Sequence, residues 1–201
     1  AVETGMISIV DTLGTLGREL ARGEIDQISN VEHHLIDEQA YFDVIRQKTA
    51  SLFVSCMQMG ALSVSAPLEE TCKLMTFGEK LGLCFQIKDD IFDYYEDISI
   101  GKPTGNDIRE GKVTLPLLYA LQHGNKDEAV FMSELLKKNE LSVDEVNSLI
   151  MFARNNGGIQ YAEGVMDRLR NEGYEVLSSF GDTPITTSLK SILDYTIERK
   201  K

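Results

Sequence analysis

Apolar residues recur along the chain at alternating spacings of three and four, which is the period of an amphipathic helix. The first such stripe consists of Val2, Met6, Ile9, Leu13, Leu16 and Leu20. No helix-capping residue precedes this stripe, so the pattern predicts that the chain starts inside a helix. We therefore expect these 201 residues to be the C-terminal part of a longer protein.

The same period, together with start and stop signals, predicts further helices. They cover residues 37–65, 67–97, 113–123, 126–138, 142–157, 158–180 and 184–200. Pro67 and Pro184 suit the first turn of a helix. Ser142 and Glu145 form a capping box, and Gly157 is a stop signal.

The sequence shows no convincing alternation of apolar and polar residues and no Asn-Gly or Asp-Gly turn between such runs. We therefore predict an all-α fold, a bundle of long and mostly antiparallel helices joined by short turns. The length is that of one sizeable core, so residues 1–201 are expected to belong to one domain.

One stretch, "FQIKDDIFDYYED" at residues 85–97, combines dense negative charge with large apolar side chains. At helical spacing Asp89 and Asp93 are i and i+4 on one face, with Asp90 at its edge. Like charges at that spacing destabilise a helix unless they are neutralised. Mg²⁺ would neutralise them, since it binds one or two carboxylates together with substrate phosphates. A solvated acidic face is the alternative that these residues alone leave open.

Lysines accompany the acids. Lys102 lies in the stretch "ISIGKPTGNDIREG" at 98–111, expected to be a loop without structure of its own, and Lys112 follows it. Such long loops are usually functional. Lys48 and Thr49 lie within an apolar helical segment, where a lysine either reaches the surface or serves a cavity. Metal-binding acids with lysines are suited to neutralising a diphosphate leaving group.

Composition excludes several classes of function. A formal net charge of -12 argues against nucleic-acid binding and against binding to anionic membrane surfaces. The uncharged stretch at residues 51–68 is rich in serine and is not a membrane span. Cys56, Cys72 and Cys84 form no CxxC motif and are expected to be buried, reduced thiols in a cytoplasmic protein.

Other metal and phosphate motifs do not fit the chain. Val113 stands where a P-loop needs a hydroxyl group. A di-iron site needs glutamate three residues before histidine, but Asn30, Val31 and Ala120 occupy those positions. The histidines are therefore expected to be solvated or locally hydrogen-bonded.

The acidic stretch and the segment after it, "GKPTGNDIREGKVTLPLLYAL", resemble the second aspartate-rich motif and following loop of the trans-isoprenyl diphosphate synthases. Within that family they are most similar to the bacterial long-chain, octaprenyl-type enzymes. "RGEIDQ" at 22–27 and "KTA" at 48–50 resemble two further family segments. The resemblance implies the isoprenoid synthase fold, with residues 1–201 as the C-terminal part of that single domain and the N-terminal helices missing.

The resemblance also implies a reaction and its cofactor. An allylic diphosphate would condense with isopentenyl diphosphate to a trans-polyprenyl diphosphate, with Mg²⁺ as the cofactor. A cytoplasmic homodimer is expected, and its product may pass to a membrane. The family's first aspartate-rich motif and its arginine pair are not found here, because "DD" occurs only at Asp89-Asp90. The fragment alone is therefore expected to be inactive.

By the family pattern, Asp89, Asp90 and Asp93 are the metal ligands. The same pattern makes Asp89, Asp93, Lys48 and Lys102 the catalytic residues. The diphosphate ligands would be Lys48, Thr49, Gln86, Lys102 and Lys112. Glu24 and Gln27 match a family motif without an assigned role.

Two alternatives remain. A terpene cyclase shares the fold, but its second motif differs where Asp93 and Asp97 stand, and it would lack the lysine-bearing loop. A non-catalytic helical partner subunit would also be short, although such subunits usually lose the acidic motif that this chain keeps. Product length cannot be read from these residues.

Overall fold

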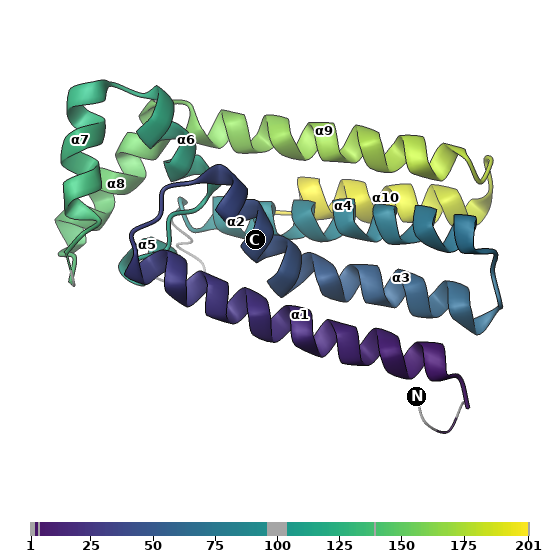
Figure 1. Ribbon diagram of the computed structural model, residues 1–201. Helices are drawn as coiled ribbons and strands as arrows, with labels where there is room; N and C mark the ends of the chain where they lie inside the picture. Colours follow the sequence, from purple (N-terminus) through teal and green to yellow (C-terminus); the bar gives the residue numbers. More distant parts are fainter. Residues whose placement is uncertain (1–2, 4, 96–103, 139, 201) are drawn as a thin grey trace. The chain divides into compact units, whose positions relative to one another are not determined.

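The computed structural model describes residues 3, 5–95, 104–138 and 140–200, and within these ranges the regular elements are helical. The all-α prediction is therefore confirmed. The elements are α1 (Ile7–Glu32), α2 (Glu38–Ile45), the π-helix η2 (Arg46–Ala50), α3 (Ser51–Ser63), α4 (Leu68–Phe92), α5 (Asn106–Arg109), α6 (Leu115–His123), α7 (Lys126–Leu135), α8 (Val143–Asn155), α9 (Gly158–Ser178) and α10 (Pro184–Glu198), shown in Figure 1.

The chain forms two compact units. Unit 1 consists of Ala1–Asp26, Asp43–Gln86 and Met166–Lys200, and the main body of unit 2 consists of Gln27–Phe42 and Ile87–Val165. The prediction that residues 1–201 are part of one domain stays a prediction.

In unit 1, α3 and α4 are antiparallel and closely packed. A Cβ atom on Gly82 would lie 2.5 Å from the Cα atom of Ala50, and one on Gly78 would lie 2.9 Å from the carbonyl oxygen of Phe53. Residue numbers therefore rise along α4 as they fall along its neighbour. The glycines let the two backbones approach more closely than any larger residue would allow.

The part of α9 from Met166 onward and α10 complete unit 1. Lys80 Nζ lies 2.6 Å from Glu172 Oε2, which ties α4 to α9. Tyr174 donates a hydrogen bond to Asp194, which ties α9 to α10. The Phe77, Leu177 and Leu193 side chains are fully buried in the apolar core of this unit.

The core of unit 2 surrounds the first turn of α6. Leu115, Leu117 and Leu118 are buried there. A Cβ on Gly158, at the start of α9, would lie 2.0 Å from the carbonyl oxygen of Pro116, so only glycine fits at this crossing. Figure 1 shows α7 and α8 connected to α6 and α9 in this unit.

Several predicted helix signals are confirmed. The Ser142 side chain accepts the N–H of Glu145, whose carboxylate accepts the N–H of Ser142. Gly157 adopts φ +76° between α8 and α9. Pro184 is the first residue of α10, and the carbonyl group of Pro67 accepts the N–H of Thr71 in the first turn of α4.

Other predictions were wrong in detail. Helix α1 begins at Ile7, after Gly5 with φ +69°, whereas the predicted stripe began at Val2, which lies outside the described residues. Residues 37–65 are helical over most of their length, but the π-helix η2 interrupts the α-helical geometry. Helix α7 ends at Leu135, three residues earlier than predicted, and the expected loop at 98–111 contains α5.

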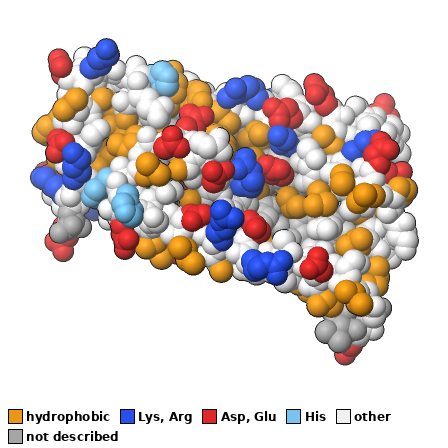
Figure 2. Space-filling model, in the orientation of Figure 1, with side chains coloured by type: hydrophobic (Ala, Val, Ile, Leu, Met, Phe, Trp, Pro, Cys, Tyr) orange, Lys and Arg blue, Asp and Glu red, His pale blue; other side chains and the backbone are white. Residues whose placement is uncertain are grey.

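The surface also differs from expectation. Cys56 and Cys72 are exposed, and only Cys84 is the buried thiol that the sequence predicted for all three. Large apolar side chains of α1 are exposed, among them Ile7, Val10, Leu13 and Leu20. Figure 2 shows hydrophobic side chains at the surface of the molecule. None of the helices in the described ranges is both long and apolar enough to span a membrane.

Candidate diphosphate and metal site

The acidic residues lie at the C-terminal end of α4 in unit 2. Asp89 and Asp90 are in its last turn, where Asp89 is half-buried and Asp90 is buried. The helix ends at Phe92, so Asp93 is the first residue beyond it. The prediction that Asp89 and Asp93 share a helical face is therefore wrong for Asp93, because the chain has already left the helix.

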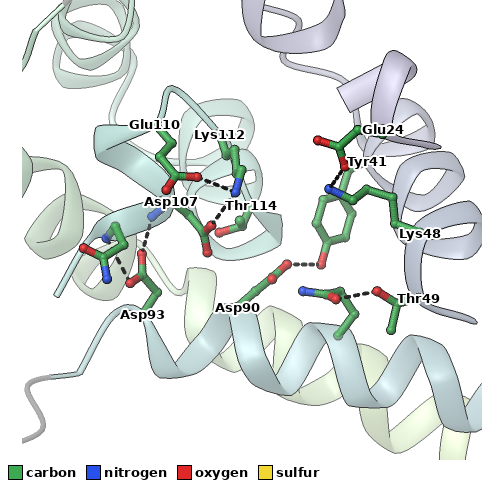
Figure 3. A network of polar contacts seen from close by, with 12 residues as sticks. Glu24, Tyr41, Lys48, Thr49, Asp90, Asp93, Asp107, Glu110, Lys112 and Thr114 are labelled. Atoms are coloured by element: carbon green, nitrogen blue, oxygen red, sulfur yellow. Dashed lines mark hydrogen bonds and ion pairs between the residues drawn. The ribbon is translucent and has the colours of Figure 1, made fainter. Parts of the chain in front are cut away.

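The Asp93 carboxylate turns toward α5 (Figure 3). Its Oδ1 accepts the N–H of Asn106 and its Oδ2 accepts the N–H of Asp107, each at 3.0 Å. The carbonyl group of Asp93 also accepts the N–H of Gly105, whose left-handed φ of +74° begins the short helix. Asp93 therefore satisfies N–H groups at the start of α5 that lack partners within the helix.

The Asp90 carboxylate has a buried partner on α2. Tyr41 Oη donates a hydrogen bond of 2.6 Å to Asp90 Oδ2, and the two residues are 8% and 4% exposed. Burial, with the adjacent Asp90 charge, raises the pKa of Tyr41 well above its usual value. The phenol is therefore a neutral donor to this carboxylate.

Lys112 lies between two carboxylates just beyond α5. Its Nζ is 3.3 Å from Asp107 Oδ1 and 2.6 Å from Glu110 Oε2, as Figure 3 shows. Burial raises the pKa of Asp107, although Lys112 acts in the opposite direction. Burial alone would lower the pKa of Lys112, but the hydrogen bond to Glu110 and the charge of Asp107 raise it. A diphosphate that binds Lys112 would compete with these carboxylates.

Three further predicted ligands, Lys48, Thr49 and Gln86, lie in unit 1, on and near η2. The N–H of Ser51 bonds to the carbonyl oxygen of Arg46, the i to i+5 bond that defines a π-helix. This wider turn contains Lys48 and Thr49. Single π-turns within α-helices are frequent at functional sites, although this one was not predicted from the sequence.

Both η2 side chains have polar partners within unit 1. Lys48 Nζ lies 2.5 Å from Glu24 Oε2 on α1 (Figure 3). Thr49 Oγ1 donates to Gln86 Oε1 on α4 at 2.6 Å. A Cβ on Gly23 would lie 2.9 Å from the backbone nitrogen of Lys48, so glycine allows α1 to approach η2. The segments "RGEIDQ" and "KTA" therefore lie in direct contact.

The structure thus joins Thr49 with Gln86, and Asp93 with the first amides of α5. Lys48 belongs to unit 1 and Asp89 to unit 2, so the common catalytic site that the family pattern implies for them stays a prediction. Lys102 and Asp97 lie outside the described residues.

Sequence reasoning missed two partners. The sequence pattern did not indicate Tyr41 as a partner of Asp90, although Tyr41 lies two helical turns before Lys48 and is a polar residue on an apolar segment. Glu24 was noticed within a motif but had no role, and it is the counterion of Lys48. Pairing between residues that are far apart in sequence leaves no periodic signal.

The histidines behave as expected, since His33 and His123 are exposed and their Nδ1 atoms contact carbonyl oxygens of their own helices.

Across the described ranges, no three His, Cys, Asp or Glu side chains form a ready-made metal cluster. Carboxylates are nevertheless the hard oxygen ligands that Mg²⁺ prefers, and it typically binds one or two of them together with water and phosphate. The acids of α4 therefore fit an ion that arrives with a diphosphate.

Comparisons with known proteins agree with the resemblance in the motifs. The family described as "Polyprenyl synthetase" matches residues 2–152. Octaprenyl diphosphate synthase of Escherichia coli is 28% identical over 98% of this chain and 61% of its own length. The geranylgeranyl diphosphate synthase of Methanosarcina mazei is 27% identical over 97% of this chain and 59% of its own.

Solved structures show the same similarity. A geranylgeranyl pyrophosphate synthase from Bacteroides thetaiotaomicron matches 99% of this chain and 66% of its own, with 43% identity and a TM-score of 0.92. A polyprenyl synthase from Caulobacter crescentus, complexed with calcium and isoprenyl diphosphate, has 27% identity and a TM-score of 0.91. It is covered over 61% of its length, so the chain spans about three fifths of such relatives.

Proposed function

The chain belongs to the polyprenyl synthetase family, and from this premise we propose that it forms part of an enzyme that elongates prenyl chains. In the proposed reaction, the carbon–oxygen bond of an allylic diphosphate breaks and releases diphosphate. The double bond of isopentenyl diphosphate attacks the allylic carbon, and loss of a proton gives a trans-polyprenyl diphosphate. The relatives are named for products of different length, so the proposal concerns the reaction and not the length.

The observation that carries this proposal is the position of the acids on α4. The C-terminal end of a helix carries a partial negative charge and normally attracts cations. Here Asp89 and Asp90 occupy the last turn, which contains no basic residue, and Asp93 follows directly. Three carboxylates so close to the negative end of a helix repel one another, and a bound cation would relieve that repulsion, which supports a metal site.

Asp89, with Asp93 and Asp90, is proposed to hold Mg²⁺, which when bound would supply positive charge to the diphosphate leaving group. Asp89 is proposed as the principal ligand from the family pattern. Asp90, which is buried against Tyr41, and Asp93, which accepts two amides, are proposed to support it.

Lys48, Thr49, Gln86, Lys102 and Lys112 are proposed as diphosphate ligands. Lys48 and Lys112 each carry a positive charge beside exchangeable surface carboxylates, Glu24 and Glu110, which a more highly charged diphosphate can displace. The Thr49 hydroxyl and the Gln86 amide are already aligned by their mutual hydrogen bond. We further propose a cytoplasmic homodimer as the working enzyme.

The test uses two preparations, the 201-residue chain and the complete product of the reading frame that encodes it. Each is incubated with Mg²⁺, an allylic diphosphate and radiolabelled isopentenyl diphosphate, and the products are separated by chain length. Longer labelled prenyl diphosphates from the complete product would support the proposal, and no turnover is expected from the 201 residues alone.

Two other results would overturn the proposal. Release of diphosphate from the allylic substrate without incorporation of isopentenyl diphosphate would indicate a cyclase. Activity that appears only after addition of a second, different chain, and that survives Asp89→Asn, would indicate a non-catalytic partner subunit.

A further inference from the structure

Tyr41 is the residue in the acidic region that neither the motif nor the proposed reaction accounts for. It lies on α2 in unit 2, and its side chain is buried together with that of Asp90, 49 residues further along the chain. The oxygen–oxygen distance of 2.6 Å is in the range of charge-assisted O–H···O⁻ bonds, which are stronger than neutral ones. Figure 3 shows the phenol pointing directly at the carboxylate.

A buried carboxylate needs such a partner, since burying it without one is strongly unfavourable. A lysine or arginine would also stabilise the buried carboxylate, but its positive charge would weaken the attraction of the acidic region for a cation. A phenol donates a hydrogen bond and adds no charge. Tyr41 therefore orients the Asp90 carboxylate while preserving the negative character of the region.

Asp90 follows Asp89 directly in the last turn of α4, so a contact that anchors Asp90 also anchors the backbone that carries Asp89. The Tyr41 bond attaches this turn to α2 at its most acidic point. Hydrogen-bonding partners of this kind, one step removed from a metal ligand, typically control metal affinity.

We propose that Tyr41 is a positioning residue for cation binding, and that it acts by holding the Asp90 carboxylate in place beside Asp89. This inference rests on the proposed function, because it concerns the same metal site. It goes further by assigning the site's orientation to a residue on a different helix, outside the aspartate-rich motif.

The experiment measures binding and not turnover. Mg²⁺ is titrated calorimetrically, in the presence of inorganic diphosphate, into the complete product of the reading frame that encodes this chain. Tyr41→Phe, which removes only the hydroxyl group, should weaken Mg²⁺ binding by about tenfold or more. Diphosphate binding in the absence of Mg²⁺ should be unchanged.

The matched control is Tyr94→Phe. Tyr94 is also a buried tyrosine of unit 2, and its hydroxyl shares a 2.8 Å hydrogen bond with Thr114 Oγ1, a neutral partner. Urea unfolding should show a loss of stability for both variants, larger for Tyr41→Phe because it takes a hydrogen bond from a buried carboxylate, whereas Mg²⁺ affinity should fall only for Tyr41→Phe. Equal Mg²⁺ affinities in the two variants would overturn the inference and show a purely structural bond.

Two further variants keep the test decisive if Tyr41→Phe folds poorly. Asp90→Asn should itself weaken Mg²⁺ binding, and adding Tyr41→Phe to it should weaken binding no further, because Tyr41 acts through Asp90. Additive losses would overturn the inference. If the wild-type protein does not bind Mg²⁺, the proposed metal site itself is wrong. A wild-type protein that binds Mg²⁺ and a Tyr41→Phe variant that binds it equally well would overturn only the role of Tyr41.

Discussion

The three motif aspartates have different surroundings although they look alike in the sequence. Asp90 is buried and accepts the Tyr41 hydroxyl, Asp93 caps α5, and Asp89 is half-buried in the last turn of α4. The same residue type therefore has a different environment at each position of the proposed site. Asp89 is the principal metal ligand by the family pattern, so we expect its replacement to have the largest effect on chemistry.

Replacing Asp89 by asparagine in the complete protein should lower the turnover number by about 10²–10³-fold, as is typical for loss of one electrostatic stabiliser. The substitution keeps the side-chain volume but removes the charge that would hold Mg²⁺. Steady-state kinetics with saturating substrates measure the effect. The control is Asp182→Asn, because the Asp182 side chain is 99% exposed and 3.9 Å from Lys190. Equal losses in the two variants would contradict a metal role.

The thiols provide a second prediction at this scale. Burial raises the pKa of Cys84 from 9.0 to about 12, and its Sγ donates to the carbonyl oxygen of Met166. At pH 8, a thiol reagent should therefore label Cys56 and Cys72 rapidly in the native protein and Cys84 only after unfolding. A Cys56→Ser variant should show one rapid thiol.

The same raised pKa sets the sign of a pH effect. The unfolded thiol ionises near pH 9 whereas the folded one does not, so the contribution of Cys84 to stability is complete below pH 9 and is lost as the pH rises toward 12. Rapid labelling of all three native thiols at pH 8 would contradict this description.

At the scale of elements, glycines determine how closely the helices of unit 1 approach. Gly23 allows α1 to contact η2, and Gly82 allows α4 to contact Ala50 at the end of η2. The π-helix and its two close neighbours thus hold Lys48 and Thr49 by backbone packing. The positions of these two proposed diphosphate ligands therefore depend on the glycine contacts.

Gly82→Ala should destabilise the protein by about 1–3 kcal/mol, the usual cost of overpacking. The added methyl group would lie 2.5 Å from a backbone atom of Ala50, so a helix would have to move. Urea unfolding monitored by circular dichroism measures the change. Gly60→Ala on α3 is the control, because its added Cβ meets nothing within 4 Å. It should stabilise the protein by up to about 1 kcal/mol through helix propensity. Equal effects of the two substitutions would contradict the packing described.

At the scale of the whole molecule, the excess of acidic residues conflicts with binding an anionic substrate. The formal net charge is -12, and a diphosphate adds to that charge. Local lysines and a divalent cation can reverse the field at a site even when the protein as a whole is acidic. Binding of diphosphate should therefore depend on the cation.

Mg²⁺ and inorganic diphosphate added together should raise the thermal unfolding midpoint by several degrees. A ligand present at about 100 times its dissociation constant stabilises the folded state by about 2.7 kcal/mol. Differential scanning fluorimetry measures the shift, and either component alone should produce less. Sodium chloride at matched ionic strength is the control, because salt screens the repulsion within an acidic protein. A shift no larger than that of the salt would contradict a diphosphate site.

The local pattern of the sequence determined the all-α class, the order of the helices and most of their ends. Ser142, Gly157 and Pro184 act through neighbours three or four residues away, so their effects can be read from a single stretch of chain. The motif "FQIKDDIFDYYED" likewise identified the acidic region and its family. Such features need no knowledge of what packs against them.

Only the tertiary structure decided what the site residues contact. The Tyr41–Asp90 bond joins residues 49 apart, and Asp93 bonds to amides 13 and 14 residues away. The π-turn at Lys48 was not predicted from the apolar pattern of its segment. Each of these features depends on which segments the fold brings together, and a contact between residues far apart in sequence leaves no trace in the local pattern of either segment.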